Sequence, residues 1–187
     1  MNADPRNEID GDYLGEEAHH LRWRKTMEFI GTSPMKGRPV GRGLDLGDKT
    51  PLTGSLEEFF SCPFDNTSND LDTGTLEGRY GVVTAFEVFE HLFNPLHALL
   101  QVRNVLDGKD ARLFLSMPLR KPGFLASPGH FHEMSRREAG MLFRRAGFDV
   151  VKSGEFRIRR PMFYLTGFKP LMRAFYEKVQ IYELTRT

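Results

Sequence analysis

The chain has 187 residues, of which 40% are hydrophobic and 27% charged, a balance typical of a soluble globular protein with one sizeable core. Its formal net charge of +1 argues against nucleic acid or a membrane surface as the main partner, and no apolar run reaches the roughly 18–20 residues of a membrane span. The polar N-terminus does not resemble a secretory signal, and the single cysteine has no partner for an internal disulfide, so we expect a cytoplasmic protein.

The first elements are predicted from hydrophobic spacing and turn residues. Apolar residues at three- and four-residue intervals predict a helix over 13–30, ended by a loop rich in glycine and proline. Residues 42–47 are typical of a short strand that ends in a turn. Residues 51–60 are typical of a helix, with Thr53 or Ser55 available as a cap near its start.

The rest of the chain continues to alternate between strands and helices. Further strands are predicted at 80–86, 111–118, 148–151 with a second piece from 156, and 179–184, and further helices at 95–106, 135–146 and 170–177. Ser135 and Glu138 have the spacing of a capping box. This alternation predicts an α/β fold with a doubly wound, mostly parallel sheet. We expect a flexible arm over 1–12 and a single domain over 13–187.

The segment TAFEVFEHLFNP directly follows the predicted strand over 80–86 and is rich in groups that carry chemistry. Glu87, Glu90 and His91 have the spacing of residues on one face of a helical turn. They follow the carboxyl end of a strand, which is where open α/β sheets bind their ligands. The sequence therefore predicts a carboxylate–histidine site at this edge of the sheet.

Five segments taken in order resemble the class I S-adenosylmethionine-dependent methyltransferases, in particular the small type with an EVxEH segment. They are GLDLG at 43–47, TAFEVFEHLFNP at 84–95, NVLDGKDARLFLSMP at 104–118, HFHEMSRREAGMLFRRAGFDV at 130–150 and the closing strand IYEL at 181–184. The resemblance covers most of residues 40–185. It implies a Rossmann-like sheet, closed by an antiparallel strand.

The resemblance also implies where S-adenosylmethionine binds. The cofactor-binding candidates are Asp45, Gly47, Asp65, Asp70, Asp72 and Phe86. Gly47 would let the backbone approach the ligand, and Asp45 would face its amino-acid part. Asp65 is the candidate for the ribose, and Asp70 or Asp72 for the adenine.

The chain departs from the family pattern in two places. The glycine-rich loop D-x-G-x-G-x-G is here DLGDKTP, so only Gly47 remains and Pro51 follows it. Only 33 residues separate Gly47 from Tyr80. One strand–helix unit of the nucleotide-binding half is therefore expected to be missing or collapsed into residues 61–79.

Two roles are open for the carboxylate–histidine segment. Some members of the superfamily hold a divalent cation with such a segment and a later histidine, which here gives Glu87, Glu90, His91 and either His130 or His132 as ligands for Mg²⁺ or Mn²⁺. Alternatively, His91, His130 or His132 acts as a general base without metal, or the histidine is structural. His130 and His132 flank Phe131, so one of them is expected to point inward and the other outward.

The expected function is methyl transfer from S-adenosylmethionine to a hydroxyl of a small or carbohydrate-like acceptor. The eroded glycine loop leaves open a non-catalytic binding protein with this fold. A metal-dependent RNA 2′-O-methyltransferase is the third alternative, and the near-zero net charge argues against it. The sequence makes no prediction of the oligomeric state.

Overall fold

The computed structural model describes residues 17–125, 127, 129–158 and 176–187. The expected arm over 1–12, the start of the first helix and nearly all of the helix predicted at 170–177 lie outside these residues. The described elements are α1 (Glu17–Ile30), β1 (Gly43–Asp45), α2 (Pro51–Phe60), β2 (Phe64–Asn66), β3 (Val82–Phe86), η2 (Phe89–His91), α3 (Pro95–Val105), β4 (Arg112–Pro118), η3 (Gly123–Leu125), α4 (Arg136–Arg145), β5 (Phe148–Phe156) and β6 (Val179–Arg186).

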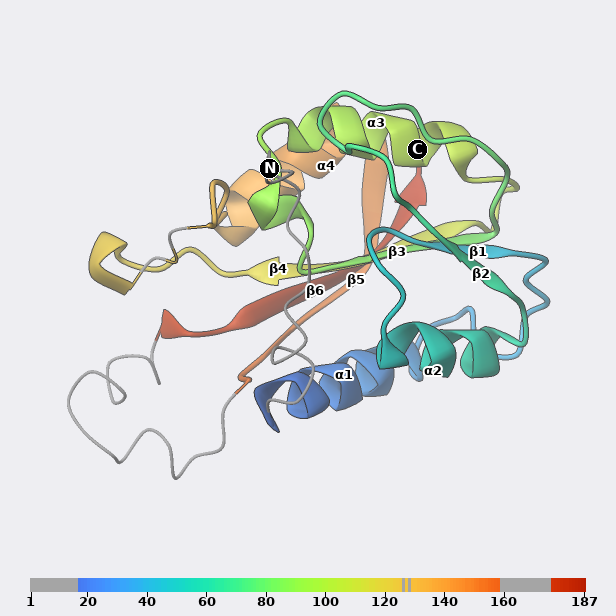
Figure 1. The fold of residues 1–187 in the computed structure, drawn as a ribbon, viewed down its shortest axis with the longest axis horizontal. Coiled ribbons are helices and arrows are strands. Elements are labelled where there is room, and N and C mark those ends of the chain that lie inside the picture. The colour runs from blue at the N-terminus through green and yellow to red at the C-terminus, as the bar shows by residue number, and fades with distance from the viewer. Residues whose placement is uncertain (1–16, 126, 128, 159–175) are drawn as a thin grey trace, which may run out of the picture.

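A six-stranded sheet forms the centre of the described part, with the strand order β2-β1-β3-β4-β6-β5. Strands β2, β1, β3 and β4 pair in parallel, and β6 lies antiparallel between β4 and β5. Helices α1 and α2 cover one face of the sheet, and α3 and α4 cover the other (Figure 1). The predicted α/β class and the doubly wound, mostly parallel sheet are confirmed, as is the antiparallel closing strand.

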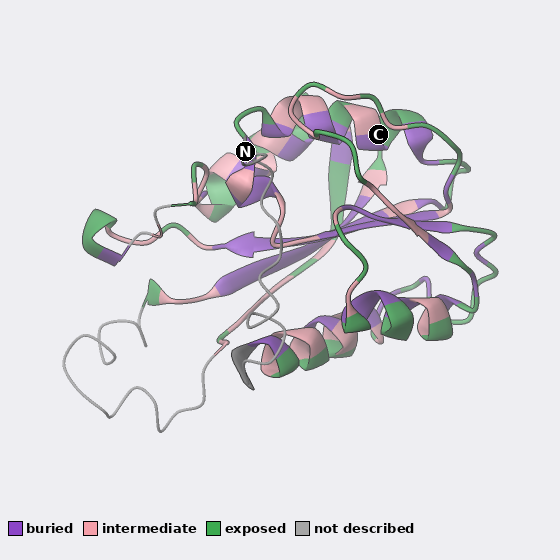
Figure 2. Ribbon diagram, in the orientation of Figure 1, coloured by how far each residue is buried: buried purple, intermediate pink, exposed green. Residues whose placement is uncertain are grey.

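Each face of the sheet has its own hydrophobic core. Leu99, Val102 and Phe143 belong to the cluster under α3 and α4, and Ile30 and Leu56 to the cluster under α1 and α2. Strands β1, β3, β4 and β6 are buried along most of their length, while the helices alternate between buried and exposed faces (Figure 2). Because each large apolar side chain contributes about 1.5–3 kcal/mol on burial, these two layers fix the sheet and so the loops at its edges.

The nucleotide-binding half is shortened, as the sequence predicted. Strand β2 is present at the edge of the sheet, but residues 67–81 contain no helix. Instead this segment crosses over α3 as a loop (Figure 1), and the ring of His97 donates from Nε2 to the carbonyl of Gly74 at 2.8 Å. The strand of the expected unit is therefore kept, and its helix is replaced by a loop packed on α3.

Several local predictions need correction. Thr50, not Thr53 or Ser55, is the N-cap of α2, and the Thr50 N–H donates to Thr53 Oγ1 at 3.1 Å. Strand β5 is one continuous strand with an irregularity after Val150, not two pieces. The capping box of α4 is confirmed, with Ser135 as the N-cap. Within the described residues, no helix is both long and apolar enough to cross a membrane.

Candidate functional site

The segment after β3 does not continue as a helix through Glu87. Glu87 adopts a left-handed backbone conformation with φ of 58°, which is uncommon for any residue except glycine. Its N–H donates to the carbonyl of Ser116 on β4, and the Ser116 hydroxyl donates to Glu87 Oε1 at 2.8 Å. Arg22 of α1 lies 3.5 Å from Glu87 Oε2. The prediction that Glu87 shares a helix face with Glu90 and His91 is therefore wrong. Glu90 and His91 lie on the short 3-10 helix η2, and Glu87 precedes it.

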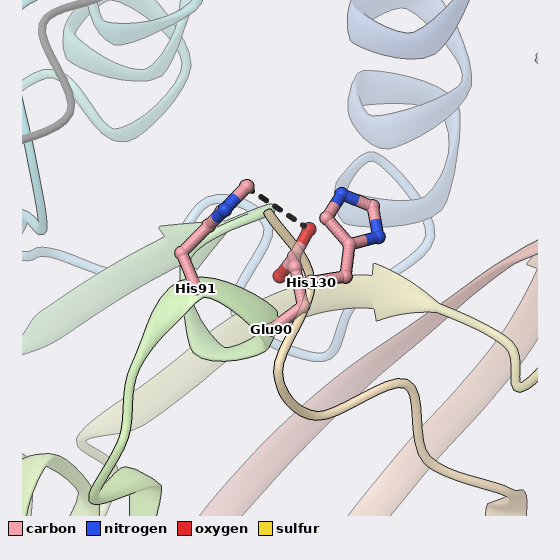
Figure 3. A group of neighbouring side chains, drawn as sticks. All are labelled: Glu90, His91 and His130. Atoms are coloured by element: carbon pink, nitrogen blue, oxygen red, sulfur yellow. Dashed lines mark ion pairs between the residues drawn. The ribbon is translucent and has the colours of Figure 1, made fainter. Parts of the chain in front are cut away.

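Three of the expected site residues come together beyond β3. One ligand atom from each of Glu90, His91 and His130 lies within 4.8 Å of the other two (Figure 3). The distance from His91 Nε2 to Glu90 Oε1 is 4.0 Å, and the two imidazole rings meet edge to face with centroids 4.9 Å apart. Glu90 and His91 come from η2, whereas His130 comes from the loop between β4 and α4. Two segments far apart in the sequence thus build one cluster.

The two imidazoles have the same hydrogen-bonding arrangement. His91 Nδ1 donates to the carbonyl of Gly129 at 2.8 Å, and His130 Nδ1 contacts Glu133 Oε1 at 2.8 Å. When each ring is neutral, its Nε2 is therefore a hydrogen-bond acceptor. His132 points elsewhere, because its Nε2 contacts the carbonyl of Phe93 at 3.3 Å. Of the two histidines that flank Phe131, only His130 reaches the cluster.

Glu90 is a buried acid that lacks a hydrogen-bond partner. Its side chain is 1% exposed, and neither carboxyl oxygen accepts or donates a hydrogen bond among the residues that the structure describes. Burial raises the pKa of Glu90 well above its usual value, and the negative charge of Glu87 adds to the increase. Burial also lowers the pKa of His91, which keeps that ring neutral near pH 7. An unpaired buried acid beside two imidazoles indicates a site for a ligand, because such a group costs free energy without one.

A cavity of about 220 Å³ opens onto this cluster. Its walls come from α1, from the end of β4 and the loop after it, and from the residues that flank β5 and β6. The lining residues are His19, Arg22, Glu87, Glu90, His91, Pro118, Lys121, Ser127, His130, Ile158, Glu177, Lys178 and Val179. Only three of them are apolar. The cavity is therefore suited to a small polar molecule.

A larger cavity of about 440 Å³ lies at the opposite edge of the sheet, before β1, β3 and β4. Three of its arginines are already in ion pairs: Arg38 with Asp110 at 2.7 Å, Arg79 with Asp107 at 3.5 Å, and Arg42 with Asp65 at 2.7 Å. We assign the functional site to the smaller cavity, because that one contains the unpaired buried acid and the two imidazoles.

The turn after β1 has room for a ligand although its glycine loop is eroded. Gly47 has a φ of 105°, and a Cβ built on it would meet no atom within 4 Å. The turn is held from β2: the Asn66 amide donates to the Gly47 carbonyl at 3.0 Å, and the Gly47 N–H donates to Thr67 Oγ1 at 2.9 Å. Phe86, at the end of β3, is half-buried against the core under α1 and α2. This open space beside a glycine fits the backbone approach that S-adenosylmethionine binding requires.

Asp45 is buried under this turn and does not face open space. Its two oxygens accept hydrogen bonds from the hydroxyls of Thr84, at 2.6 Å, and Thr53, at 2.7 Å. It is 7% exposed. Burial raises the pKa of Asp45 to about 6, against the opposing effect of the two hydroxyls. Asp45 therefore joins β1, β3 and the start of α2, and its direct contact with the cofactor stays a prediction.

This pKa makes a testable contribution to stability. The folded state holds the Asp45 proton more tightly than the unfolded chain, whose pKa is about 3.9. The free energy of unfolding should therefore fall by about 3 kcal/mol as the pH rises from about 4 to above 6. Urea unfolding at several pH values should show this loss in the wild type and not in Asp45→Asn. Equal slopes in the two proteins would contradict the assignment.

The other predicted cofactor carboxylates have partners away from the cluster. Asp65 accepts a hydrogen bond from the Tyr80 hydroxyl at 2.8 Å and pairs with Arg42 at 2.7 Å. Asp70 accepts from Asp72 N–H and so shapes its own turn, and Asp72 accepts from the N–H of Asn94 at 2.6 Å. The cofactor roles of these carboxylates stay predictions. The side chains that contact Gly47 are those of Asn66 and Thr67.

Sequence reasoning missed two residues of the site. Lys121 lines the cavity but has no motif, and its position depends on how the loop after β4 packs. Glu133 could have been found, since a carboxylate three residues after His130 is a common partner of an imidazole. Burial alone would raise the pKa of Glu133, but hydrogen bonds from Lys121 and His130 lower it below its usual value.

Comparison with known proteins places the chain in a family. A sequence model of a methyltransferase-domain family matches residues 13–153, which is most of the chain. The chain belongs to this methyltransferase family. No curated protein matches the sequence. The methyltransferase domain therefore includes both the turn after β1 and the Glu90–His91–His130 cluster.

Solved structures have the same fold at low sequence identity. A chain in the complex of the Haloferax volcanii Trm112 methyltransferase activator with a putative methyltransferase has a TM-score of 0.70 and 10% identity, covering 97% of this chain and 100% of its own. A putative methyltransferase from Bacillus halodurans has a TM-score of 0.61 and 11% identity, and the match covers 87% of this chain and 97% of that one. An O-methyltransferase from a trans-AT PKS multienzyme of Brevibacillus brevis, in complex with S-adenosyl-L-homocysteine, has a TM-score of 0.63 and 11% identity. The match covers 98% of this chain and 81% of that one. The fold is that of class I S-adenosylmethionine-dependent methyltransferases.

Proposed function

We propose that this domain transfers a methyl group from S-adenosylmethionine to a hydroxyl of a small, polar, carbohydrate-like acceptor. The observation that carries the proposal is the inner lining of the 220 Å³ cavity. Neither Glu90 oxygen has a hydrogen-bond partner among the described residues, and His91 and His130, when neutral, each present an Nε2 acceptor. A ligand that satisfies the two imidazoles must bring hydrogen-bond donors, and hydroxyl groups donate without adding charge and can also accept the proton of a neutral Glu90.

Bound S-adenosylmethionine supplies an electrophilic methyl group on a positively charged sulfonium. The chain would hold it at the open turn around Gly47, with Asn66 and Thr67 keeping that turn in shape. His130 Nε2 accepts the hydrogen bond of the acceptor hydroxyl and then its proton. Fixing the two reactants near each other supplies much of the rate.

The cofactor part of the proposal predicts the effect of Gly47→Val. A valine would fill the open space beside the turn and would be forced into a backbone conformation that β-branched residues avoid. We expect the affinity for S-adenosylhomocysteine, measured by calorimetry, to fall at least about tenfold, which corresponds to about 1.4 kcal/mol.

Gly37→Val is the matched control for this variant. Gly37 also has a positive φ, 75°, and open space at its Cβ position, but lies in the loop after α1. It should carry a similar backbone strain and bind S-adenosylhomocysteine like the wild type. Undetectable binding of S-adenosylhomocysteine to the folded wild type at millimolar concentration would instead support a non-catalytic binding protein.

The acceptor is tested directly by transfer of label. Wild-type protein is incubated with S-adenosylmethionine labelled in the methyl group and a panel of sugars, polyols and catechols, each paired with a deoxy analogue. Labelled product should form with hydroxyl compounds and not with their deoxy partners. Labelling confined to amines or to RNA would overturn the proposed acceptor class.

A divalent cation is a second candidate ligand for the same cluster, favoured by the convergence of Glu90, His91 and His130. Metal–ligand bonds of about 2.1 Å place neighbouring ligand atoms about 3.0–3.4 Å apart, so the 4.0 Å between His91 and Glu90 would have to shorten. Calorimetric titration with MnCl₂ should then show binding that is lost in Glu90→Gln. Glu87→Gln should bind Mn²⁺ normally, because Glu87 is held by Ser116 and Arg22. No heat of binding in the wild type would exclude the cation.

A further inference from the structure

Glu133 connects two residues of the cavity wall. Its Oε1 lies 2.8 Å from His130 Nδ1 and 2.9 Å from Lys121 Nζ. Its Oε2 accepts the backbone N–H of Lys121 at 3.3 Å. The Glu133 side chain is 8% exposed, and that of Lys121 is 9% exposed. One buried carboxylate therefore fixes both an imidazole and an ammonium group that line the same cavity.

The contact with Glu133 determines which nitrogen of His130 carries a proton. An ionised carboxylate can only accept hydrogen bonds, so Nδ1 must be the protonated nitrogen of the neutral ring. Nε2 then has a free lone pair. Lys121 holds the Glu133 carboxylate at both oxygens, with its ammonium group at Oε1 and its backbone N–H at Oε2, and so opposes rotation of the carboxylate away from His130. Without Glu133 nothing in this contact would select between the two tautomers of His130.

We propose that Glu133 is a positioning residue of the acceptor site, which holds His130 as the Nδ1–H tautomer with Nε2 available to the ligand and holds Lys121 Nζ at the cavity wall. The effect of Glu133 on catalysis rests on the proposed methyl transfer. The tautomer of His130 and the placement of Lys121 do not depend on that proposal, so both can be tested before any acceptor is known. Glu133 acts through His130 and Lys121 and does not itself line the cavity.

The decisive measurement is the nitrogen spectrum of the His130 ring. Protein labelled with ¹⁵N-histidine is recorded by long-range proton–nitrogen correlation, and His130→Gln identifies the signals. In the wild type, Nδ1 should have the shift of a protonated nitrogen and Nε2 that of an unprotonated one. In Glu133→Met, which removes the acceptor but keeps the size, the two shifts should move towards a mixture of tautomers. Glu133→Gln, whose amide oxygen still accepts, should restore most of the wild-type pattern.

Glu138→Gln is the control, because Glu138 completes the capping box of α4 and does not contact His130. It should leave the His130 nitrogens unchanged. A wild-type His130 with the proton on Nε2 would overturn the proposal without any variant. Unchanged His130 signals in a folded Glu133→Met protein would overturn the proposal as well. If Glu133→Met does not fold, the same measurement is made on Glu133→Ala.

Once an acceptor is known, steady-state kinetics distinguish a positioning role of Glu133 from a merely structural one. Glu133→Met should lower kcat about 10–100-fold, the usual effect of removing the partner of a functional histidine, with the KM for S-adenosylmethionine unchanged. Lys121→Met should raise the KM for the acceptor and leave the His130 tautomer as it is. A wild-type kcat in Glu133→Met would overturn the positioning role while leaving the proposed methyl transfer intact. Absence of methyl transfer in the wild type would instead remove the proposed function and leave the tautomer result standing.

Discussion

Replacing His130 with glutamine should lower the rate of methyl transfer by about 10²–10⁴-fold, the usual contribution of a positioned general base. Glutamine keeps a polar side chain in the cavity but cannot take the proton from the acceptor hydroxyl. His130 is the best-placed base, because its ring is 18% exposed, meets His91 at 4.9 Å between centroids and is oriented by Glu133. Initial rates with labelled S-adenosylmethionine, together with calorimetric binding of S-adenosylhomocysteine, measure the two effects separately. Cofactor binding should be unchanged, because His130 lies outside the turn around Gly47.

His132→Gln is the matched control for this experiment. His132 is two residues away on the same loop, but its ring contacts the carbonyl of Phe93 and not the cluster. Its replacement should leave the rate within a few-fold of the wild type. If His130→Gln retained the full rate, methyl transfer would depend on positioning alone. If His132→Gln were the slow variant, the loop between β4 and α4 would have to rearrange when the acceptor binds.

Much of the fold could be predicted from local patterns because those patterns describe the layers that the chain buries. The apolar segments at 80–86 and 111–118 became neighbouring parallel strands, and the capping box at Ser135 starts α4. The shortened segment after β2 could also be predicted, since the residue count left no room for a helix. The continuity of β5 could not, because the polar residues 152–155 lack a hydrophobic signal and the strand depends on pairing with β6.

The site was predicted less completely, for a physical reason. Sequence spacing identifies which groups are close along the chain, as with Glu90 and His91, but not which oxygens are already engaged. Asp45 is satisfied by Thr53 and Thr84, and Glu87 by Ser116 and Arg22. These partners come from other elements, so their presence depends on packing. Glu90 differs from them in having no hydrogen-bond partner within the described part of the chain, and that distinction is visible only in three dimensions.

The largest expected effect on stability comes from a buried ion pair that connects the sheet to the loop after α1. Arg112 Nε lies 3.5 Å from Glu183 Oε1, and their side chains are 13% and 0% exposed. The Ser33 hydroxyl, three residues beyond α1, donates to the same Glu183 oxygen at 2.9 Å. Glu183 thus tethers the end of the helix whose His19 lines the acceptor cavity.

Arg112→Met should therefore lower the free energy of unfolding by about 3–5 kcal/mol, because it leaves the Glu183 carboxylate buried without its cation. Urea unfolding at neutral pH measures the loss. The double variant Arg112→Met, Glu183→Leu is the control, and should recover most of the stability because it removes the stranded charge together with its partner. A loss below about 1 kcal/mol in the single variant would mean that Lys152, whose charge acts on Glu183, compensates for the missing guanidinium. Recovery in the double variant would show that the cost lies in the unpaired charge and not in the packing of the arginine stem.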